Sequence, residues 1–277
     1  MADTPTPFNV VHDGVTLSGE VAGDGPPVLL LHGLTATRRY VLHGSRALER
    51  AGYRVISFDA RGHGKSTGPD DMVSYDYASL AADALAVLDT LGASAAALVG
   101  HSMGAATAVT VALATPKRVA ALVLITPAHR GVPSPDLERF DRLADGLEQG
   151  GPDGFLEALG PSDVGDRYSE TVRTVIRQRL VRHARPETVA QALRATPRTT
   201  AFDGLDALHA VRAPTLVVGS RDDADPGHPF SVAESWASRI PGARLEVEVE
   251  GESPLAWRGG TLSALIASVL GPIPRWS

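Results

Sequence analysis

Short apolar runs alternate with segments of helical periodicity along the first half of the chain. Val28–Leu31 is entirely apolar, which is typical of a strand covered on both faces of a parallel sheet. Tyr75–Leu91 carries apolar residues at helical spacing and stops at Gly92. The pattern predicts a mostly parallel sheet built from βαβ units. The other predicted strands are Val15–Val21, Tyr53–Phe58, Ala95–Val99 and Val119–Ile125, and the other predicted helices are Arg39–Ala51 and Ser102–Ala114.

The alternation stops between Pro127 and Arg212, where only helical patterns separated by Gly and Pro are found. The predicted helices are Leu137–Leu147, Gly154–Leu159, Tyr168–His183 and Glu187–Ala195. Strands and helices then alternate again over Thr215–Val218, Val232–Ile240, Arg244–Val249 and Leu262–Leu270. We therefore expect an α/β core made of residues 1–126 and 213–277, with a helical cap inserted over residues 127–212.

Composition narrows the classes of function. The 277 residues contain no cysteine, which excludes disulfides, thiolate metal sites and a cysteine nucleophile. The formal net charge of -6 argues against a nucleic-acid partner. No apolar run is long enough to span a membrane, and the polar N-terminus does not look like a targeting segment. We expect a cytoplasmic protein that acts on a small molecule. The Leu, Val and Phe content of residues 127–212 suggests that this molecule is apolar or mixed in character.

The pentapeptide Gly100-His101-Ser102-Met103-Gly104 follows an apolar strand and opens a helix. This G-x-S-x-G pattern predicts a nucleophile elbow, a sharp turn that presents the hydroxyl of Ser102 above the sheet. The N-terminus of the following helix offers backbone N–H groups to a developing oxyanion, and the N–H of Met103 is the candidate donor.

A second polar turn, Leu31-His32-Gly33-Leu34, ends the earlier apolar strand, so the chain leaves the sheet beside the predicted elbow. The N–H of Leu34 is therefore the candidate second oxyanion donor. For the His32 side chain we favour a structural role within its own loop. The glycine-rich segment Asp59–Ser66 lacks the spacing of a phosphate-binding loop and is interpreted as a structural turn.

The motifs HGL, DARGHGKS, GHSMG and PTLVVGSRDD, in this order, resemble the α/β-hydrolase superfamily over nearly the whole chain. The similarity is to capped members such as esterases, lactonases, haloperoxidase-like enzymes and C–C bond hydrolases. It implies an eight-stranded, mostly parallel sheet with a helical cap between strands six and seven. It also implies a catalytic acid in a G-x-x-D-x-x-x-P turn, which makes Asp222 the candidate, although Asp223 and Asp225 lie in the same loop.

The chain departs from the superfamily at the catalytic base. The family's histidine follows the last strand, but Glu252 occupies that position, between Gly251 and Pro254, and no histidine follows His228. A glutamate, with an ordinary pKa of about 4.3 against about 6.5 for histidine, is a weaker base at neutral pH. We expect the Glu252 carboxyl to lie within hydrogen-bonding reach of Ser102 or Asp222, directly or through one water.

Two histidines are further candidates. His228 lies six residues after Asp222, where it could serve as an alternative base, and His129 lies just beyond the sixth predicted strand, where it could contact substrate. No metal site and no cofactor is expected, because the sequence carries no dinucleotide fingerprint, Walker loop or H-E-x-x-H motif.

Three functions fit these features. The first is hydrolysis of a small ester, lactone or related acyl compound by Ser102 with an atypical base. The second is non-hydrolytic chemistry, such as a cyclisation, isomerisation or elimination, in which Asp222 and Glu252 transfer protons. The third is a catalytically silent protein that binds a ligand.

Overall fold

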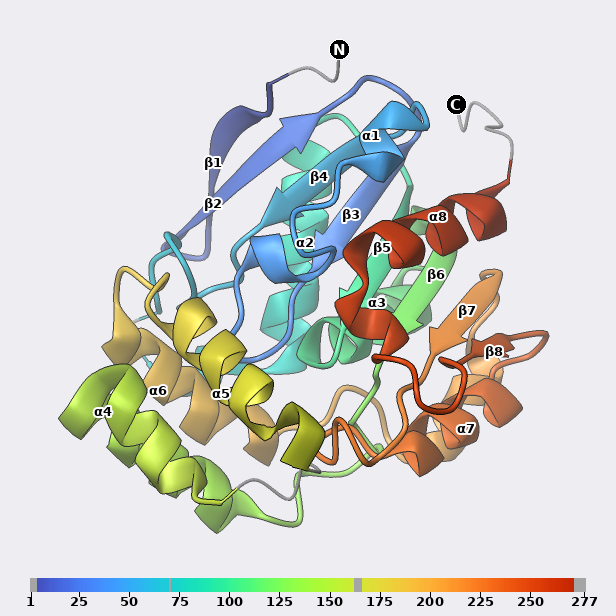
Figure 1. The fold of residues 1–277 in the computed structure, drawn as a ribbon. Coiled ribbons are helices and arrows are strands. Elements are labelled where there is room, and N and C mark those ends of the chain that lie inside the picture. The colour runs from blue at the N-terminus through green and yellow to red at the C-terminus, as the bar shows by residue number, and fades with distance from the viewer. Residues whose placement is uncertain (1–3, 70, 162–165, 272–277) are drawn as a thin grey trace.

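The computed structural model describes residues 4–69, 71–161 and 166–271. Its centre is an eight-stranded sheet with the order β1-β2-β4-β3-β5-β6-β7-β8 (Figure 1). Strands β3 to β8 pair in parallel, and only β2 pairs antiparallel, with β1 and β4. The predicted mostly parallel eight-stranded sheet is thus confirmed. The strands are β1 (Thr6–His12), β2 (Val15–Ala22), β3 (Pro27–Leu31), β4 (Arg54–Phe58), β5 (Ala96–His101), β6 (Val119–Ile125), β7 (Thr215–Val218) and β8 (Arg244–Glu246).

Helices cover both faces of this sheet, which explains why its strands are apolar on both sides. Leu29 and Leu31 of β3 pack in one core, together with α2 (Tyr77–Thr90), α3 (Met103–Ala114) and α7 (Phe230–Arg239). Val28 and Leu30 pack in the opposite core, together with α1 (Ala47–Arg50) and α8 (Gly259–Leu270). No helix in the described part of the chain is both long and apolar enough to cross a membrane.

Three helices lie between β6 and β7, and in Figure 1 they sit beyond the carboxyl ends of the strands. They are α4 (Leu137–Leu159), α5 (Asp166–Leu180) and α6 (Pro186–Ala195), and they share a separate apolar core. Two 3-10 helices follow, at Thr196–Arg198 and Leu205–Ala210. Within the described residues of the interval 127–212, which we call the helical segment, no strand is present.

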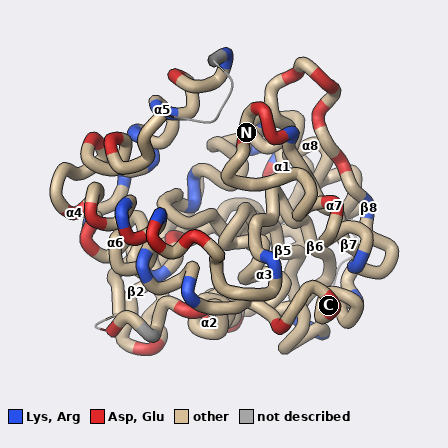
Figure 2. The backbone as a smooth tube through the Cα atoms, turned by 90° about the horizontal axis from the view of Figure 1, so that it is seen from below, with Lys and Arg blue, Asp and Glu red and all other residues tan. Residues whose placement is uncertain are grey.

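Ion pairs add to the apolar packing between α4 and α6. Arg194 of α6 donates two hydrogen bonds of 2.8 Å to the Glu148 carboxylate of α4 and also binds Asp145. Arg198 binds Asp141 at 2.7 Å. Figure 2 shows these helices carrying neighbouring acidic and basic residues. The network fixes two helices of the helical segment to one another.

Two features of the N-terminal half differ from the sequence-based expectations. Strand β1 pairs with β2 along its whole length and was not predicted. The predicted helix over Arg39–Ala51 is wrong, because only a 3-10 turn at Arg38–Tyr40 and the short α1 form there. Between them, His43 and Gly44 adopt φ values of 49° and 76°, which a right-handed helix does not allow. The His43 ring instead lies 3.1 Å from the carbonyl oxygen of Ala256.

Candidate active site

Ser102 lies on the sharp turn between β5 and α3. Its backbone has φ 53° and ψ -112°, an unfavourable conformation for a residue with a side chain. The Ser102 N–H donates a 3.0 Å hydrogen bond to the carbonyl oxygen of Ile125 at the end of β6, which holds the turn against the neighbouring strand. The side chain is partly exposed. A strained serine between a strand and a helix is the geometry that the G-x-S-x-G pattern predicts.

The two glycines of the motif are required by close backbone contacts. A Cβ atom at Gly100 would lie 2.2 Å from the carbonyl oxygen of Gly104. A Cβ atom at Gly104 would lie 2.1 Å from the carbonyl oxygen of Leu31. Any larger residue would push α3 away from β5 or from the end of β3. The elbow therefore keeps its tight turn because both flanking positions lack a side chain.

The loop after β3 runs beside the elbow. A Cβ atom at Gly33 would lie 3.2 Å from the Ser102 Cβ atom, so the next residue, Leu34, is close to the nucleophile position. Met103 is the first residue of α3, where a helix has no acceptor for its N–H groups. In the described part of the chain, neither the Leu34 nor the Met103 N–H has a backbone acceptor. Both donors are therefore available to an oxyanion.

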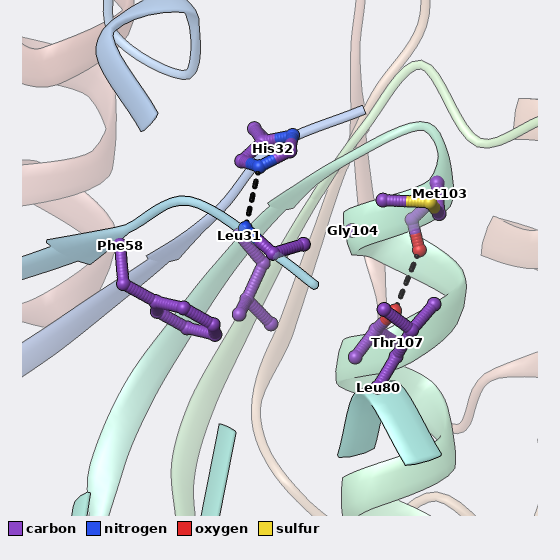
Figure 3. Close-up of a pocket in the computed structure, with 8 residues that line it drawn as sticks. Leu31, His32, Phe58, Leu80, Met103, Gly104 and Thr107 are labelled. Atoms are coloured by element: carbon purple, nitrogen blue, oxygen red, sulfur yellow. Dashed lines mark hydrogen bonds between the residues drawn. The ribbon is translucent and has the colours of Figure 1, made fainter. Parts of the chain in front are cut away.

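His32 is held by its own loop. Its Nδ1 donates to the carbonyl oxygen of Gly33 at 2.8 Å, and its Nε2 accepts from the N–H of Ala60 at 2.8 Å (Figure 3). Because Nε2 must be unprotonated to accept this bond, the ring is neutral, and burial lowers its pKa. This arrangement matches the structural role that we favoured for this side chain.

Ser102 lines neither of two hollows in the structure. The cavity in Figure 3 lies beneath the elbow, between His32, Met103 and Thr107, and its volume of about 10 Å³ accommodates no more than one water molecule. A hollow of about 700 Å³ lies between α4 and α5 and is lined by polar residues such as Glu157 and Arg173. These hollows therefore do not identify a substrate pocket at Ser102.

A histidine and an aspartate pair in the loop after β7. The Nδ1 atom of His228 lies 2.9 and 3.0 Å from the two carboxylate oxygens of Asp225. Burial alone would raise the pKa of Asp225, but His228, followed by His101 and Arg179, lowers it below its ordinary value. With Nδ1 facing the Asp225 carboxylate, the Nε2 atom on the other side of the His228 ring has no hydrogen-bond partner among the described residues.

The His228 ring lies next to the elbow. Its centroid is 5.5 Å from that of His101, the residue immediately before Ser102. Burial lowers the pKa of His101 to about 3, and the charge of His228 adds to this effect, so His101 is neutral at physiological pH. His101 Nε2 lies 3.1 Å from the hydroxyl of Thr126, which fixes its ring. The structure thus brings His228 and the nucleophile position to the same edge of the sheet.

Asp222, the acid that the family pattern indicates, contacts a different partner. Its carboxylate accepts a 2.7 Å hydrogen bond from the N–H of Phe230, the first residue of α7. This contact satisfies a backbone donor at a helix start. Among the described residues, the aspartate paired with a histidine in this loop is Asp225, three positions further along. Asp222 and Asp225, both candidates for the catalytic acid from the sequence, are therefore distinguished by their hydrogen-bond partners.

Glu252 does not have the expected partners. Its carboxylate binds Arg258 at 3.0 Å, and its side chain is 49% exposed. Among the described residues, Glu252 makes no direct hydrogen bond to Ser102 or Asp222, so the direct form of the expected contact is not observed. The reason is local: Gly251 adopts φ 83°, and the loop turns the carboxylate towards the start of α8.

His129 is bound within the protein. Its Nε2 accepts a 3.1 Å hydrogen bond from the N–H of Ala201, and its ring packs edge-on against Phe202, with centroids 5.0 Å apart. Its carbonyl oxygen accepts from the indole of Trp236 at 2.8 Å. Burial lowers the pKa of His129 to about 4. These contacts favour a structural role over the substrate contact considered from the sequence.

Glu248 was not singled out from the sequence, although it links the loops around the site. Its side chain is buried, and its carboxylate accepts from the N–H of Arg221 at 2.7 Å and from that of Leu255 at 3.1 Å. One carboxylate thus connects the loop that carries Asp225 and His228 to the loop before α8. Its position shortly after a predicted strand could have pointed to this role, but several other acidic residues lie in the same short segment.

The amino-acid sequence is similar to known families and proteins. Residues 26–256 match the family model described as alpha/beta hydrolase fold. The chain belongs to the α/β-hydrolase family. A Variovorax paradoxus protein named as the carbamate hydrolase RutD is 34% identical over 206 residues, 73% of this chain and 75% of that protein. Other curated α/β-hydrolase relatives, including epoxide hydrolases, match over shorter stretches, and the chain spans about a third of their length.

Two solved α/β-hydrolase structures are similar over nearly the whole chain. The enol-lactonase from Burkholderia xenovorans LB400 has a TM-score of 0.77 and 24% identity, covering 96% of this chain and 100% of that one. The esterase EaEST from Exiguobacterium antarcticum has a TM-score of 0.75 and 27% identity, covering 96% and 99%. The first likeness concerns the fold alone. In the described part of this α/β hydrolase, no group of three or more His, Asp or Glu side chains could hold a metal ion.

Proposed function

We propose that the protein is a serine hydrolase that acts on a small carboxylic ester, lactone or related acyl compound. In this proposal Ser102 is the nucleophile, His228 the general base and Asp225 the residue that orients the base. The observation that carries it is the hydrogen bond between Asp225 and His228, with the His228 ring 5.5 Å from that of His101, next to Ser102. A serine, a histidine that takes its proton and a carboxylate that orients the histidine form the relay of acyl transfer.

The proposed reaction has two halves, the formation of an acyl-enzyme and its hydrolysis. The Ser102 oxygen attacks the carbonyl carbon while His228 Nε2 takes the hydroxyl proton, and His228 then gives that proton to the leaving alkoxide. Water next attacks the acyl-enzyme, with His228 again taking and returning a proton, which releases the carboxylic acid and frees Ser102. Asp225 stays ionised and stabilises the imidazolium that forms twice in the cycle.

The oxyanion is stabilised by backbone donors. The Leu34 and Met103 N–H groups lack backbone acceptors in the described residues, and Gly33 approaches Ser102 closely. Donors that are fixed before the reaction stabilise the tetrahedral intermediate without reorganisation. This arrangement supports attack at a carbonyl group, in keeping with a relative named as a carbamate hydrolase and a similar solved structure named as an esterase.

The helical segment is proposed to act as a cap. Helices α4, α5 and α6 lie beyond the carboxyl ends of the strands, where ligands bind in open α/β sheets (Figure 1). A cap there would exclude water from Ser102 and contact the part of the substrate that does not react.

The pairing of Asp222 with Glu252 for non-hydrolytic proton transfer has less support. Each carboxylate has its own partner, Phe230 N–H for Asp222 and Arg258 for Glu252. For the two carboxylates to transfer protons together, Asp222 would have to leave the Phe230 N–H and Glu252 would have to leave Arg258.

Reaction with a fluorophosphonate probe tests the proposal, because only an activated serine attacks such a probe. We expect rapid labelling of the native protein on Ser102, located by mass spectrometry, and no labelling of Ser102→Gly. Glycine is the suitable control because it tolerates the positive φ of this position. A folded native protein that stays unlabelled would contradict the hydrolase and favour a ligand-binding protein.

A further inference from the structure

Helix α5 bridges two loops of the candidate site. At its start, the Tyr168 hydroxyl donates to the carbonyl oxygen of Glu252 at 3.3 Å. Beyond its end, the His183 ring lies 3.1 Å from the carbonyl oxygen of Thr35, and the Ala184 N–H donates to the carbonyl oxygen of Gly64 at 2.8 Å. The helix is thus attached on one side to the loop before α8 and on the other to the loops after β3 and β4, and it crosses the edge where Ser102 lies.

Arg179 lies near the end of α5, four residues before His183. Its Nε atom is shielded from solvent and has no hydrogen-bond partner among the described residues. No carboxylate of the described chain lies within ion-pair distance of Arg179 either, in contrast to the buried Arg61, which forms two 2.7 Å hydrogen bonds with Asp83. A shielded Nε–H donor without an acceptor is costly in a protein that binds nothing there.

The charge of Arg179 acts on the candidate site. Burial lowers the pKa of Arg179, and Asp225 is the first of the groups that oppose this effect. The charge also contributes to lowering the pKa of His101, after burial and after His228. Asp225 is already hydrogen-bonded to His228, so it does not neutralise Arg179 in an ion pair.

We propose that Arg179 binds a carboxylate carried by the substrate at its non-reacting end, so that the enzyme prefers anionic acyl compounds such as the monoesters of dicarboxylic acids. This inference rests on the proposed function and specifies its substrate class. A guanidinium matches a carboxylate with two parallel hydrogen bonds, which supplies the missing partner of Arg179 and orients the ester over Ser102. Arg179 is then a specificity-determining residue.

The kinetic test compares monomethyl glutarate with methyl pentanoate, which differ only in a terminal carboxylate or methyl group. We expect the native enzyme to prefer monomethyl glutarate, and Arg179→Met to lower kcat/KM for this ester at least about tenfold more than it lowers kcat/KM for methyl pentanoate. Arg179→Lys should restore part of the preference. Equal losses on both esters, or a native preference for methyl pentanoate, would overturn the proposal.

Arg177 provides the matched control. It lies on the same helix, is 53% exposed and pairs with Asp153 of α4. Arg177→Met removes the same charge from α5, so a general electrostatic effect would lower turnover of the anionic ester equally in both variants. We expect Arg177→Met to retain the native preference, and a loss equal to that of Arg179→Met would count against a specific site.

A binding measurement separates this inference from the proposed hydrolysis. Calorimetry of Ser102→Gly with monomethyl glutarate reports binding without turnover, after a thermal melt has confirmed that each variant is folded. Binding that weakens at least tenfold in Ser102→Gly/Arg179→Met supports the anion site even if the native protein hydrolyses neither ester. Binding that Arg179→Met leaves unchanged refutes the site even if hydrolysis is observed.

Discussion

The His228 Nδ1 atom lies 2.9 Å from a carboxylate oxygen of Asp225, inside the loop that follows β7. The two residues are only three positions apart, so a single loop supplies both the base and its orienting acid in the proposed relay. In the motif of the family, the histidine comes from a later loop, where this chain has Glu252. In the proposed relay, the loop after β7 thus supplies the histidine that the family pattern places after the last strand.

Replacing Asp225 by Asn should lower kcat for ester hydrolysis about a thousandfold or more, because the amide no longer stabilises the imidazolium or fixes its tautomer. Asp222→Ala is the control. It should lower the free energy of unfolding by about 1 kcal/mol through the lost contact with Phe230 and leave kcat nearly unchanged. Steady-state kinetics and urea unfolding measure the two effects, and a larger loss of kcat in Asp222→Ala would reverse the assignment.

Replacing Gly104 by Ala should destabilise the protein by about 1–3 kcal/mol or more, because the new Cβ atom would lie 2.1 Å from the Leu31 carbonyl oxygen. Gly260→Ala introduces the same atom into α8 at a site with nothing within 4 Å, so its stability should be unchanged or slightly raised. Urea midpoints compare the two proteins. Equal stability would mean that α3 does not approach β3 this closely.

Removing the buried Glu248 carboxylate should affect stability and catalysis together. Glu248→Ala leaves the Arg221 and Leu255 N–H groups without their acceptor, at about 1–3 kcal/mol for each donor. It should also lower kcat more than it raises KM, because the loop with His228 loses its attachment. Glu248→Gln keeps one acceptor oxygen and should be milder, while the exposed Glu234→Ala should behave as native. Native-like kcat in a folded Glu248→Ala protein would refute the positioning role.

Stability should fall as the pH is lowered from about 6.5 towards 4. Burial lowers the pKa of His183 and of His129 to about 4, whereas unfolded histidine titrates near about 6.5. In this window the unfolded chain binds more protons than the folded one, so acid favours unfolding. Urea midpoints between pH 7.5 and 5 measure the slope, and His183→Gln should reduce it by the contribution of about one proton. A flat profile would indicate that these rings are not held neutral.

The sequence predicted the elbow and its oxyanion donors because they are local. Gly100 to Gly104 and the turn at Leu34 are short segments whose conformation follows from strand ends and glycine positions. The sheet was predictable for a similar reason, since apolar runs such as that of β3 report burial on both faces.

The relay was harder to predict because it depends on contacts that the sequence does not contain. Asp222 and Asp225 both fit the loop after β7, and only their partners distinguish them. His228 was considered as a base, but the family pattern directed attention to Glu252, whose outward turn depends on the backbone at Gly251. Arg179 gave no signal at all, because it is one of several arginines in α5 and its unpartnered state arises from the tertiary packing.

The identity of the base is the central claim, and kcat/KM for hydrolysis of a simple methyl ester by two variants tests it most directly. We predict that His228→Ala loses about a thousandfold or more, because no other group in the site takes the Ser102 proton, whereas Glu252→Gln retains activity within about twofold. Both proteins should show native melting curves. An active His228→Ala protein, or a Glu252→Gln protein with the larger loss, would contradict the account.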